Sequence, residues 1–342
     1  MLTKPDSDPE MTQEEFVMIR DFILERSGIL FAENKMYLLK NRLIKRMADL
    51  GIKAYRDYFY HVKYDTSNRE FSQLMNLITT NETSFFRNEP QLLSFSEEVL
   101  PLMVQAKAAD RSSRSIRIWS AGCSTGEEPY TLAMMILERL GSVAGWNIEI
   151  VANDISEQVL HKARQGEYSG ITLRNVKPTV LNKYFTRVDG SDLYKVKPEV
   201  KSLVRFSQIN LSDSRQISRN SNMDVIFCRN VMIYFSDDVK KQIVRGFYNS
   251  LRPGGYFYIG HSETLHGISK AFKLVYFKNA LVYQKEATSA PETTSRAAKA
   301  DAAGRSRIQV NRGSSSAKSG SSGGAARALD LLSKIKPMAV KK

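Results

Sequence analysis

The sequence has 342 residues, of which 42% are hydrophobic, so it can form one large or two modest domains with a sizeable core. No apolar run approaches the roughly 20 residues of a membrane-spanning helix, and no apolar core of a secretory signal follows the first methionine. Only two cysteines are present, which excludes a disulfide framework and favours a cytoplasmic protein with reduced thiols.

The formal net charge of +14 is unevenly distributed. Residues 287–342 contain 11 Lys or Arg against three acidic residues, a net +8, which leaves +6 for the rest of the chain. This tail is poor in large apolar residues. That composition is typical of low-complexity segments, which cannot bury enough apolar surface to fold alone. Within it, residues 325–336 are either a peptide for an unknown partner or a marginal helix. Because the charge is mostly a property of the tail, we expect no nucleic-acid partner.

Residues 12–88 are predicted to form a small all-helical domain of about four helices. An apolar stripe at residues 16–23 ends at Gly28, which is a suitable residue just beyond a helix end. Two further apolar stripes lie at residues 36–50 and 71–78. No cluster of residues typical of catalysis occurs in this part of the sequence.

The second predicted helix carries a row of basic residues, Lys35, Lys40, Arg42, Lys45 and Arg46. Two interpretations stay open. The row is either a solvated basic face or a docking surface for an acidic helix of a partner. The docking interpretation assigns substrate contacts to Lys40, Arg42, Lys45 and Arg46.

Residues 89–114 are predicted to be a linker helix, with Pro90 in its first turn, followed by a polar loop. From residue 115 to residue 286, strands and helices alternate, which predicts an α/β domain with a mainly parallel, Rossmann-like sheet. Strands are expected to begin near Ile116, Ile148, Leu203, Asp224 and Tyr256. Helices are expected to begin near Glu127, Ser156 and Ser236, the two serines being natural N-caps, and the last helix should end at residues 252–255.

Two β-hairpins are predicted in this domain. Residues 272–277 and 280–284 form a closing hairpin. Alternating residues around Asp189-Gly190 indicate a second hairpin, a small β-subdomain at about residues 182–200 inserted into the sheet domain. The alternative for this second segment is an ordinary long crossover.

The stretch from Ile116 to Tyr130 organises the α/β domain. A buried strand is followed by the small residues of Ala121 to Gly126 and then by a helix. Such a loop lets the backbone, at Gly122 for example, approach a nucleotide-like ligand at the carboxyl end of the sheet. The strict G-x-G-x-x-G pattern is absent, so a simple turn is the alternative.

Polar residues also follow the other predicted strands. Asp154 ends the second strand, where a carboxylate can accept hydrogen bonds from both hydroxyls of a ribose. The alternative is that Asp154 is an acidic residue favoured by the dipole of the helix that begins after it. Asn210 and Leu211 follow the third strand, near the place of a base, where Asn210 either forms a hydrogen bond with the base or caps a turn. Arg229 and Asn230 follow the fourth and form the opposite wall of the crevice. Cys228 is more typical of a buried strand residue than of a nucleophile, and no ligand-spaced cluster predicts a metal.

With these residues assembled, the chain resembles the CheR-type chemotaxis-receptor glutamate O-methyltransferases, which use S-adenosylmethionine. The resemblance covers about residues 12–286 and leaves out the tail. It is carried by NETSFFR (81–87), AGCSTGEEPY (121–130), ANDIS (152–156), FCRNVMIYF (227–235) and LRPGGYFYIGHSE (251–263), in the order of the family. The combination is far more specific than any one motif.

The resemblance implies a helical N-terminal domain, a seven-stranded methyltransferase sheet and an inserted β-subdomain. It places Asn81, Thr83 and Arg87 at the cofactor, with Arg87 holding the carboxylate of S-adenosylmethionine bidentately. It further implies that Glu127 binds the amino group, that Asp154 binds the ribose, and that Tyr234 lies at the mouth facing the substrate. The other predicted pocket residues are Ala121, Gly122, Asn210, Leu211, Arg229 and Asn230.

The implied substrate is a set of glutamates on the cytoplasmic helical bundle of a chemoreceptor. An ionised carboxylate needs no strong general base to attack a sulfonium methyl, so the lack of a Ser/His/Asp or Cys/His set fits methyl transfer. Tyr234 either orients the acceptor or packs behind the crevice. Family members that tether a receptor C-terminal peptide have a longer, glycine-richer β-subdomain loop than the compact Val188 to Asp192. We therefore expect recognition without such a peptide.

Three other functions fit the sequence less well. A nucleic-acid methyltransferase would carry an Asn/Asp-Pro-Pro-aromatic motif after the fourth strand, where this chain has Arg229 to Tyr234. A nicotinamide dehydrogenase would need the fuller glycine fingerprint. A signalling adaptor that keeps the cofactor as a structural ligand is the non-enzymatic alternative, which the intact Glu127 and Asp154 disfavour.

Overall fold

The computed structural model describes residues 9–108 and 114–287, so the stretch 325–336 and nearly all of the tail lie outside the described residues. The N-terminal part is helical, as predicted. Its elements are α1 (Gln13–Ser27), η1 (Glu33–Lys35), α2 (Met36–Asp49), α3 (Tyr55–Lys63) and α4 (Arg69–Ile78). Helix α1 begins with a capping box between Thr12 and Glu15 and ends at Gly28, whose φ of 75° gives the left-handed cap that the sequence predicted.

The predicted linker helix is present, but it is not uniform. It consists of α5 (Glu89–Leu93), a π-helical segment η2 (Ser94–Val99) and α6 (Leu100–Ala108). Single π turns of this kind are frequent near functional sites. Gln91 in α5 donates from Nε2 to the carbonyl of Ile259 at 2.7 Å, which attaches the start of this helix to the sheet.

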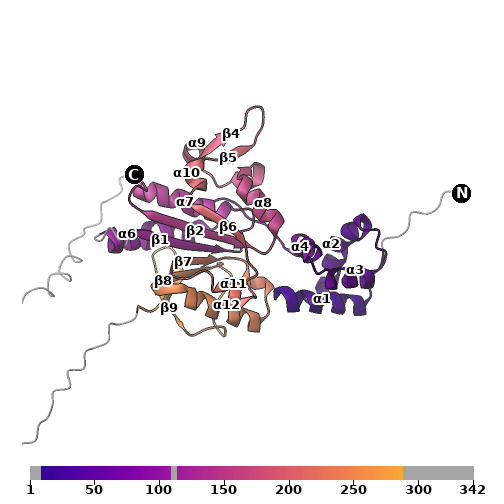
Figure 1. The fold of residues 1–342 in the computed structure, drawn as a ribbon. Coiled ribbons are helices and arrows are strands. Elements are labelled where there is room, and N and C mark those ends of the chain that lie inside the picture. The colour runs from indigo at the N-terminus through magenta and orange to yellow at the C-terminus, as the bar shows by residue number, and fades with distance from the viewer. Residues whose placement is uncertain (1–8, 109–113, 288–342) are drawn as a thin grey trace, which may run out of the picture. The chain divides into compact units, whose positions relative to one another are not determined.

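The α/β domain is built on a seven-stranded sheet, which confirms the predicted fold class (Figure 1). The strand order is β6-β2-β1-β7-β8-β10-β9, with β1, β2, β6, β7 and β8 parallel and the closing hairpin β9/β10 antiparallel. Their bounds are β1 (Ser115–Ala121), β2 (Asn147–Asp154), β6 (Val204–Gln208), β7 (Met223–Cys228), β8 (Leu251–Ile259), β9 (Phe272–Tyr276) and β10 (Leu281–Lys285).

Alternation along β1 explains how both faces of the sheet are covered. Ile116 and Ile118 pack in one core cluster with residues of the linker helix and of α7 (Glu127–Leu140). Trp119 and Ala121 pack in another cluster, which contains residues of α12 (Asp237–Ser250) and of the helical N-terminal part. The remaining helices of the domain are α8 (Glu157–Gln165), η4 (Gly170–Leu173), α9 (Pro178–Tyr184), α10 (Pro198–Lys201), α11 (Ser214–Ile217) and η5 (Met232–Tyr234).

The inserted hairpin is also present. Strands β4 (Phe185–Arg187) and β5 (Tyr194–Val196) pair antiparallel around Asp189-Gly190, and β3 (Glu167–Tyr168) pairs with β5 as a third strand. The small sheet therefore includes a segment outside the predicted bounds of 182–200. Two residues of β3 carry too little alternation to be recognised from sequence.

Two predicted boundaries are wrong, because α12 ends at Ser250, before residues 252–255, and the strand that follows it starts early. Strand β8 begins at Leu251 instead of near Tyr256, because Arg252-Pro-Gly-Gly255 continues as an irregular strand. Its register against β7 shifts between Met223 and Val225, and Gly254 takes a φ of 77° there. At the start of α12, Ser236 occupies the N-cap without a side-chain hydrogen bond, whereas the Ser156 hydroxyl accepts from Val159 N in α8 as predicted.

Candidate active site

A cavity lies over the carboxyl ends of the central strands and is closed by residues from the helical N-terminal part, including Ser27, Ile29 and Ile78. Most of the predicted site residues line it: Asn81, Thr83, Arg87, Gly122, Asp154, Asn210, Leu211, Arg229, Asn230 and Tyr234. Ala121 and Glu127 do not line it. Ala121 is buried at the end of β1, where it pairs in register with Asn153.

The loop after β1 forms the floor of the cavity. The backbone N–H groups of Gly122 and Cys123 donate to the Asn153 carbonyl at 2.7 and 2.9 Å, which turns the chain away from the sheet. Gly122 has a φ of 78°, and a Cβ there would lie 2.4 Å from a methyl of Val231. The small residue is therefore required both by its backbone conformation and by the close approach of the loop after β7.

Asp154 lies at the end of β2 beside this loop and is nearly buried. Its Oδ2 accepts from Ser124 N at 2.9 Å and its Oδ1 from Ser156 N at 3.0 Å. Burial raises the pKa of Asp154, and the backbone hydrogen bonds oppose that rise. A carboxylate offers about four acceptor positions, so two remain for a ligand that presents hydroxyl groups to the cavity.

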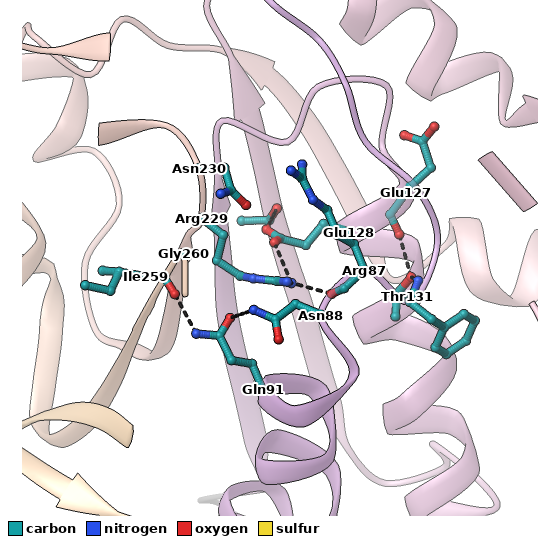
Figure 2. A network of polar contacts seen from close by, with 12 residues as sticks. Arg87, Asn88, Gln91, Glu127, Glu128, Thr131, Arg229, Asn230, Ile259 and Gly260 are labelled. Carbon is teal, nitrogen blue, oxygen red and sulfur yellow. Dashed lines mark hydrogen bonds and ion pairs between the residues drawn. The ribbon is translucent and has the colours of Figure 1, made fainter. Parts of the chain in front are cut away.

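Arg229 forms the opposite wall, between Glu128 and the backbone of Arg87 (Figure 2). One terminal nitrogen lies 3.3 Å from Glu128 Oε2, and the other donates to the Arg87 carbonyl at 2.6 Å. Arg229 Nε is buried with no hydrogen-bond partner in the part of the chain that the structure describes. Burial lowers the pKa of Arg229, and the charge of Glu128 opposes this. A buried donor without a partner beside a cavity is suited to binding a polar ligand.

Glu127 is not brought to the cavity, and its neighbour Glu128 lies there instead. Glu127 is fully buried, its Oε2 accepts from Thr125 Oγ1 at 2.7 Å, and burial raises its pKa. The helical periodicity of the sequence could have distinguished the two glutamates. Positions 127, 130 and 134 share one face of α7, so Glu127 belongs to the buried face with Tyr130 and Met134.

The NETSFFR segment enters the cavity from the side of the helical part. Phe85 anchors it by edge-to-face packing against Tyr168 and Phe185, at centroid distances of 4.8 and 5.2 Å. Phe86 and Asn88 take positive φ values of 53° and 62°, so the backbone is held in an uncommon conformation around Arg87. The Arg87 guanidinium donates to the Glu82 carbonyl at 2.8 Å, within the same segment.

Asn210 lines the cavity, but both ends of its amide are used by the protein. Its Nδ2 donates to the Arg26 carbonyl at 2.8 Å, and its Oδ1 accepts from Ser212 N at 3.0 Å. The side chain therefore shapes a turn and binds the end of α1. Tyr234 lines the cavity from the loop after β7, where its carbonyl accepts from Leu30 N at 2.8 Å.

The predicted docking residues on α2 have different environments. Arg46 forms a bidentate pair with Glu70 at 2.9 and 2.5 Å, and Arg42 donates to the Ile78 carbonyl and to Thr80 Oγ1. Lys40 lies 2.7 Å from Glu10, and Lys45 is exposed. Both arginines are thus committed to contacts within the helical part, and Lys40 is half-buried beside Glu10, which leaves Lys45 as the accessible member of the set.

Two other features bear on the predicted chemistry. Cys123 and Cys228 are free and buried, and burial raises the pKa of both thiols, which disfavours the nucleophilic thiolate. Within residues 9–108 and 114–287, no group of three or more His, Cys, Asp or Glu is arranged to hold a metal ion. No helix in the same described ranges is long and apolar enough to cross a membrane.

The sheet is mainly parallel with an antiparallel closing hairpin, and the cavity reaches from Asp154 to the loop after β7. This is the arrangement of S-adenosylmethionine-dependent methyltransferases of the Rossmann-like class. The chain belongs to the CheR methyltransferase family. The family model described as "CheR methyltransferase, all-alpha domain" matches residues 14–79, and that described as "CheR methyltransferase, SAM binding domain" matches residues 81–281. The predicted family and cofactor are thereby confirmed.

Curated relatives agree with this assignment. Chemotaxis protein methyltransferase 2 of Vibrio cholerae is 38% identical over 80% of this chain and 94% of its own length. The chemotaxis protein methyltransferase of Escherichia coli is 36% identical over 77% of this chain and 89% of its own length. The chemotaxis protein methyltransferase of Borreliella burgdorferi is 34% identical over 75% of this chain and 90% of its own length. This chain is thus a methyltransferase of the chemotaxis family, with chemoreceptors as the substrates that the family implies.

Proposed function

We propose that this protein transfers the methyl group of S-adenosylmethionine to glutamate side chains of a chemoreceptor and forms glutamyl methyl esters. The observation that carries the proposal is the cavity itself, in which the buried carboxylate of Asp154 and the Arg229–Glu128 pair face the Tyr234 loop.

The cavity lining fits such a cofactor. Asp154 has free acceptor positions for two ribose hydroxyls, and Arg229 Nε and Ser84 Oγ are buried polar atoms without a partner in the described residues. Arg87 and Arg229 supply positive charge for the carboxylate, and Glu128 supplies negative charge for the amino group in place of Glu127. Asn81, Thr83, Gly122 and Leu211 complete the wall, while Ala121 and Glu127 support it from behind.

When bound, the cofactor supplies an electrophilic methyl group on a sulfonium. A glutamate oxygen forms the new bond to that carbon as the carbon–sulfur bond breaks, and the electron pair stays on sulfur, which gives S-adenosylhomocysteine. With a reference pKa of about 4.3, the acceptor is already ionised at neutral pH, so the protein needs to align it and exclude water. We assign the orientation of the acceptor to Tyr234, which lines the cavity on the loop after β7.

We expect the partner to be the cytoplasmic helical bundle of the receptor, with α2 as the docking helix and its exposed Lys45 as the most accessible docking residue. The inserted hairpin is compact: only six residues separate β4 from β5, and Val188 N donates to the Leu193 carbonyl at 2.8 Å. We therefore predict that recognition does not need a receptor C-terminal peptide. Calorimetric titration with receptor tail peptides should give no binding heat, and micromolar binding would contradict the prediction.

The proposed activity is tested by transfer of labelled methyl groups from S-adenosylmethionine to purified receptors. Label that is released by base and maps to receptor glutamates supports the proposal. Failure on every receptor of the organism, with cofactor binding intact, would instead favour an adaptor that keeps the cofactor as a structural ligand.

A further inference from the structure

Glu263 collects three backbone N–H groups from two separate loops. It follows β8, in a turn closed by its own N–H, which donates to the Gly260 carbonyl at 2.9 Å. Its Oε2 accepts from Gly260 N at 2.6 Å and from Asn230 N at 2.8 Å, and its Oε1 accepts from Ile233 N at 3.2 Å. One carboxylate thus ties the end of β8 to the loop that follows β7.

The backbone around this carboxylate is tightly constrained. Asn230 takes a φ of 60°, a left-handed conformation that is uncommon for a residue with a side chain. A Cβ on Gly260 would lie 2.5 Å from Glu263 Oε2 and 2.9 Å from Asn230 N, so no other residue fits there without a shift. The carboxylate therefore fits a site that the surrounding backbone has shaped for it.

The tied loop is the one that faces the substrate. Arg229, Asn230, Val231, Ile233 and Tyr234 all line the cavity, whereas Glu263 does not. Arg229 has its own anchors in Glu128 and in the Arg87 carbonyl, and neither depends on Glu263. Loss of the carboxylate should therefore loosen residues 230–233, which lead into Tyr234, while the Tyr234 carbonyl stays bonded to Leu30 N and the cofactor wall at Arg229 persists.

We propose that Glu263 is a positioning residue for methyl transfer, which holds residues 230–233 so that Tyr234 can orient the acceptor carboxylate. This inference rests on the proposed function. An ionised carboxylate makes strong hydrogen bonds with all three N–H donors. Glutamine has a single acceptor oxygen, and its amide would direct N–H groups at one of the loop donors. Aspartate is shorter by one methylene and cannot span both loops.

The test compares Glu263→Gln and Glu263→Ala with the wild type. Glu199→Gln is the matched control, since Glu199 is exposed on α10, away from the cavity lining. Amide hydrogen exchange of a peptide covering residues 229–235 should become about tenfold faster in Glu263→Gln, and exchange at residues 116–125 should stay unchanged. The Kd for S-adenosylhomocysteine should rise less than about threefold, while kcat for receptor methylation falls about tenfold, and further in Glu263→Ala.

Each outcome decides. Unchanged amide exchange at residues 229–235 in Glu263→Gln would mean that Glu263 does not hold this loop, whatever the activity. Faster exchange with an unchanged kcat overturns the positioning role. Equal losses in kcat and in S-adenosylhomocysteine affinity show a merely structural role. If Glu263→Ala does not fold, Glu263→Gln still gives all three readouts. A wild-type protein that methylates no receptor contradicts the proposed function, whereas exchange still tests the tie.

Discussion

Two buried aspartates lie at opposite ends of the sheet, and their surroundings differ. Asp224, at the start of β7, accepts from Arg117 N at 2.8 Å and lies 2.6 Å from Lys107 Nζ and 2.5 Å from Arg252 Nε. Asp154, at the end of β2, accepts from the backbone N–H groups of Ser124 and Ser156 and has no ion pair within the described residues. One carboxylate is enclosed by cations, and the other keeps acceptor positions open beside a cavity. Burial of a charge therefore does not by itself indicate a ligand site; unused bonding capacity beside a cavity does.

The largest expected effect is at the enclosed carboxylate. Asp224→Ala removes the counter-charge of the buried Lys107 and of the half-exposed Arg252, which should cost about 3–5 kcal/mol in the free energy of unfolding. Denaturant unfolding measures the loss. The folded fraction should bind S-adenosylmethionine with unchanged Kd, because Asp224 is at the other end of the sheet. A shift in cofactor Kd at constant stability would break the distinction between the two aspartates.

The next effect is at the open carboxylate. Asp154→Ala removes the carboxylate that we propose as the acceptor of two ribose hydroxyls. Hydrogen bonds to a charged group contribute about 1.5–3 kcal/mol each, so the Kd for S-adenosylmethionine should rise about 100-fold or more. The exposed Asp189→Ala in the inserted hairpin is the matched control. Calorimetry gives the Kd, and circular dichroism should show an intact fold. Unchanged affinity would overturn the ribose assignment.

The two neighbouring glutamates of α7 sharpen the comparison within one motif. Glu128→Gln removes the charge beside Arg229, so the cofactor Kd should rise about tenfold. Glu127→Gln should change it less than about threefold, since Glu127 lies outside the cavity. The raised pKa of Glu127 means that its ionisation opposes folding, so stability falls as pH rises through its pKa. Glu127→Gln should therefore not lower the unfolding temperature at neutral pH. The reverse order of effects would restore Glu127 as the ligand.

The sequence was enough to predict the order of strands and helices, because periodicity and caps are local properties. The position of Asp154 at a strand end, beside a small-residue loop, followed from that order. Other features depend on contacts between distant segments. The packing of Glu127 beneath the loop, the use of Asn210 to bind the end of α1, and the tie from Glu263 to Asn230 all arise from tertiary packing. Arg42 and Arg46 looked equivalent to Lys45 in sequence. Only the fold reveals that Arg46 pairs with Glu70 and that Arg42 forms hydrogen bonds with the chain at the end of α4 and after it.

The smallest expected effect is a pH dependence that belongs to Asp154 alone. Its pKa is raised by burial, so the free protein binds a proton there at a higher pH than an exposed aspartate does. Only the ionised carboxylate can accept hydrogen bonds from both ribose hydroxyls with both of its oxygens, because the protonated form carries a hydrogen on one oxygen. Cofactor affinity should thus be complete above the pKa of Asp154 and should fall as pH drops through it. Asp154→Asn cannot titrate, so the ratio of wild-type to variant Kd, measured by calorimetry from pH 7 downward, isolates this group from the others. That ratio should approach one on acidification. A ratio that is independent of pH would mean that Asp154 is ionised throughout, and the rise in its pKa would then be too small to matter for binding.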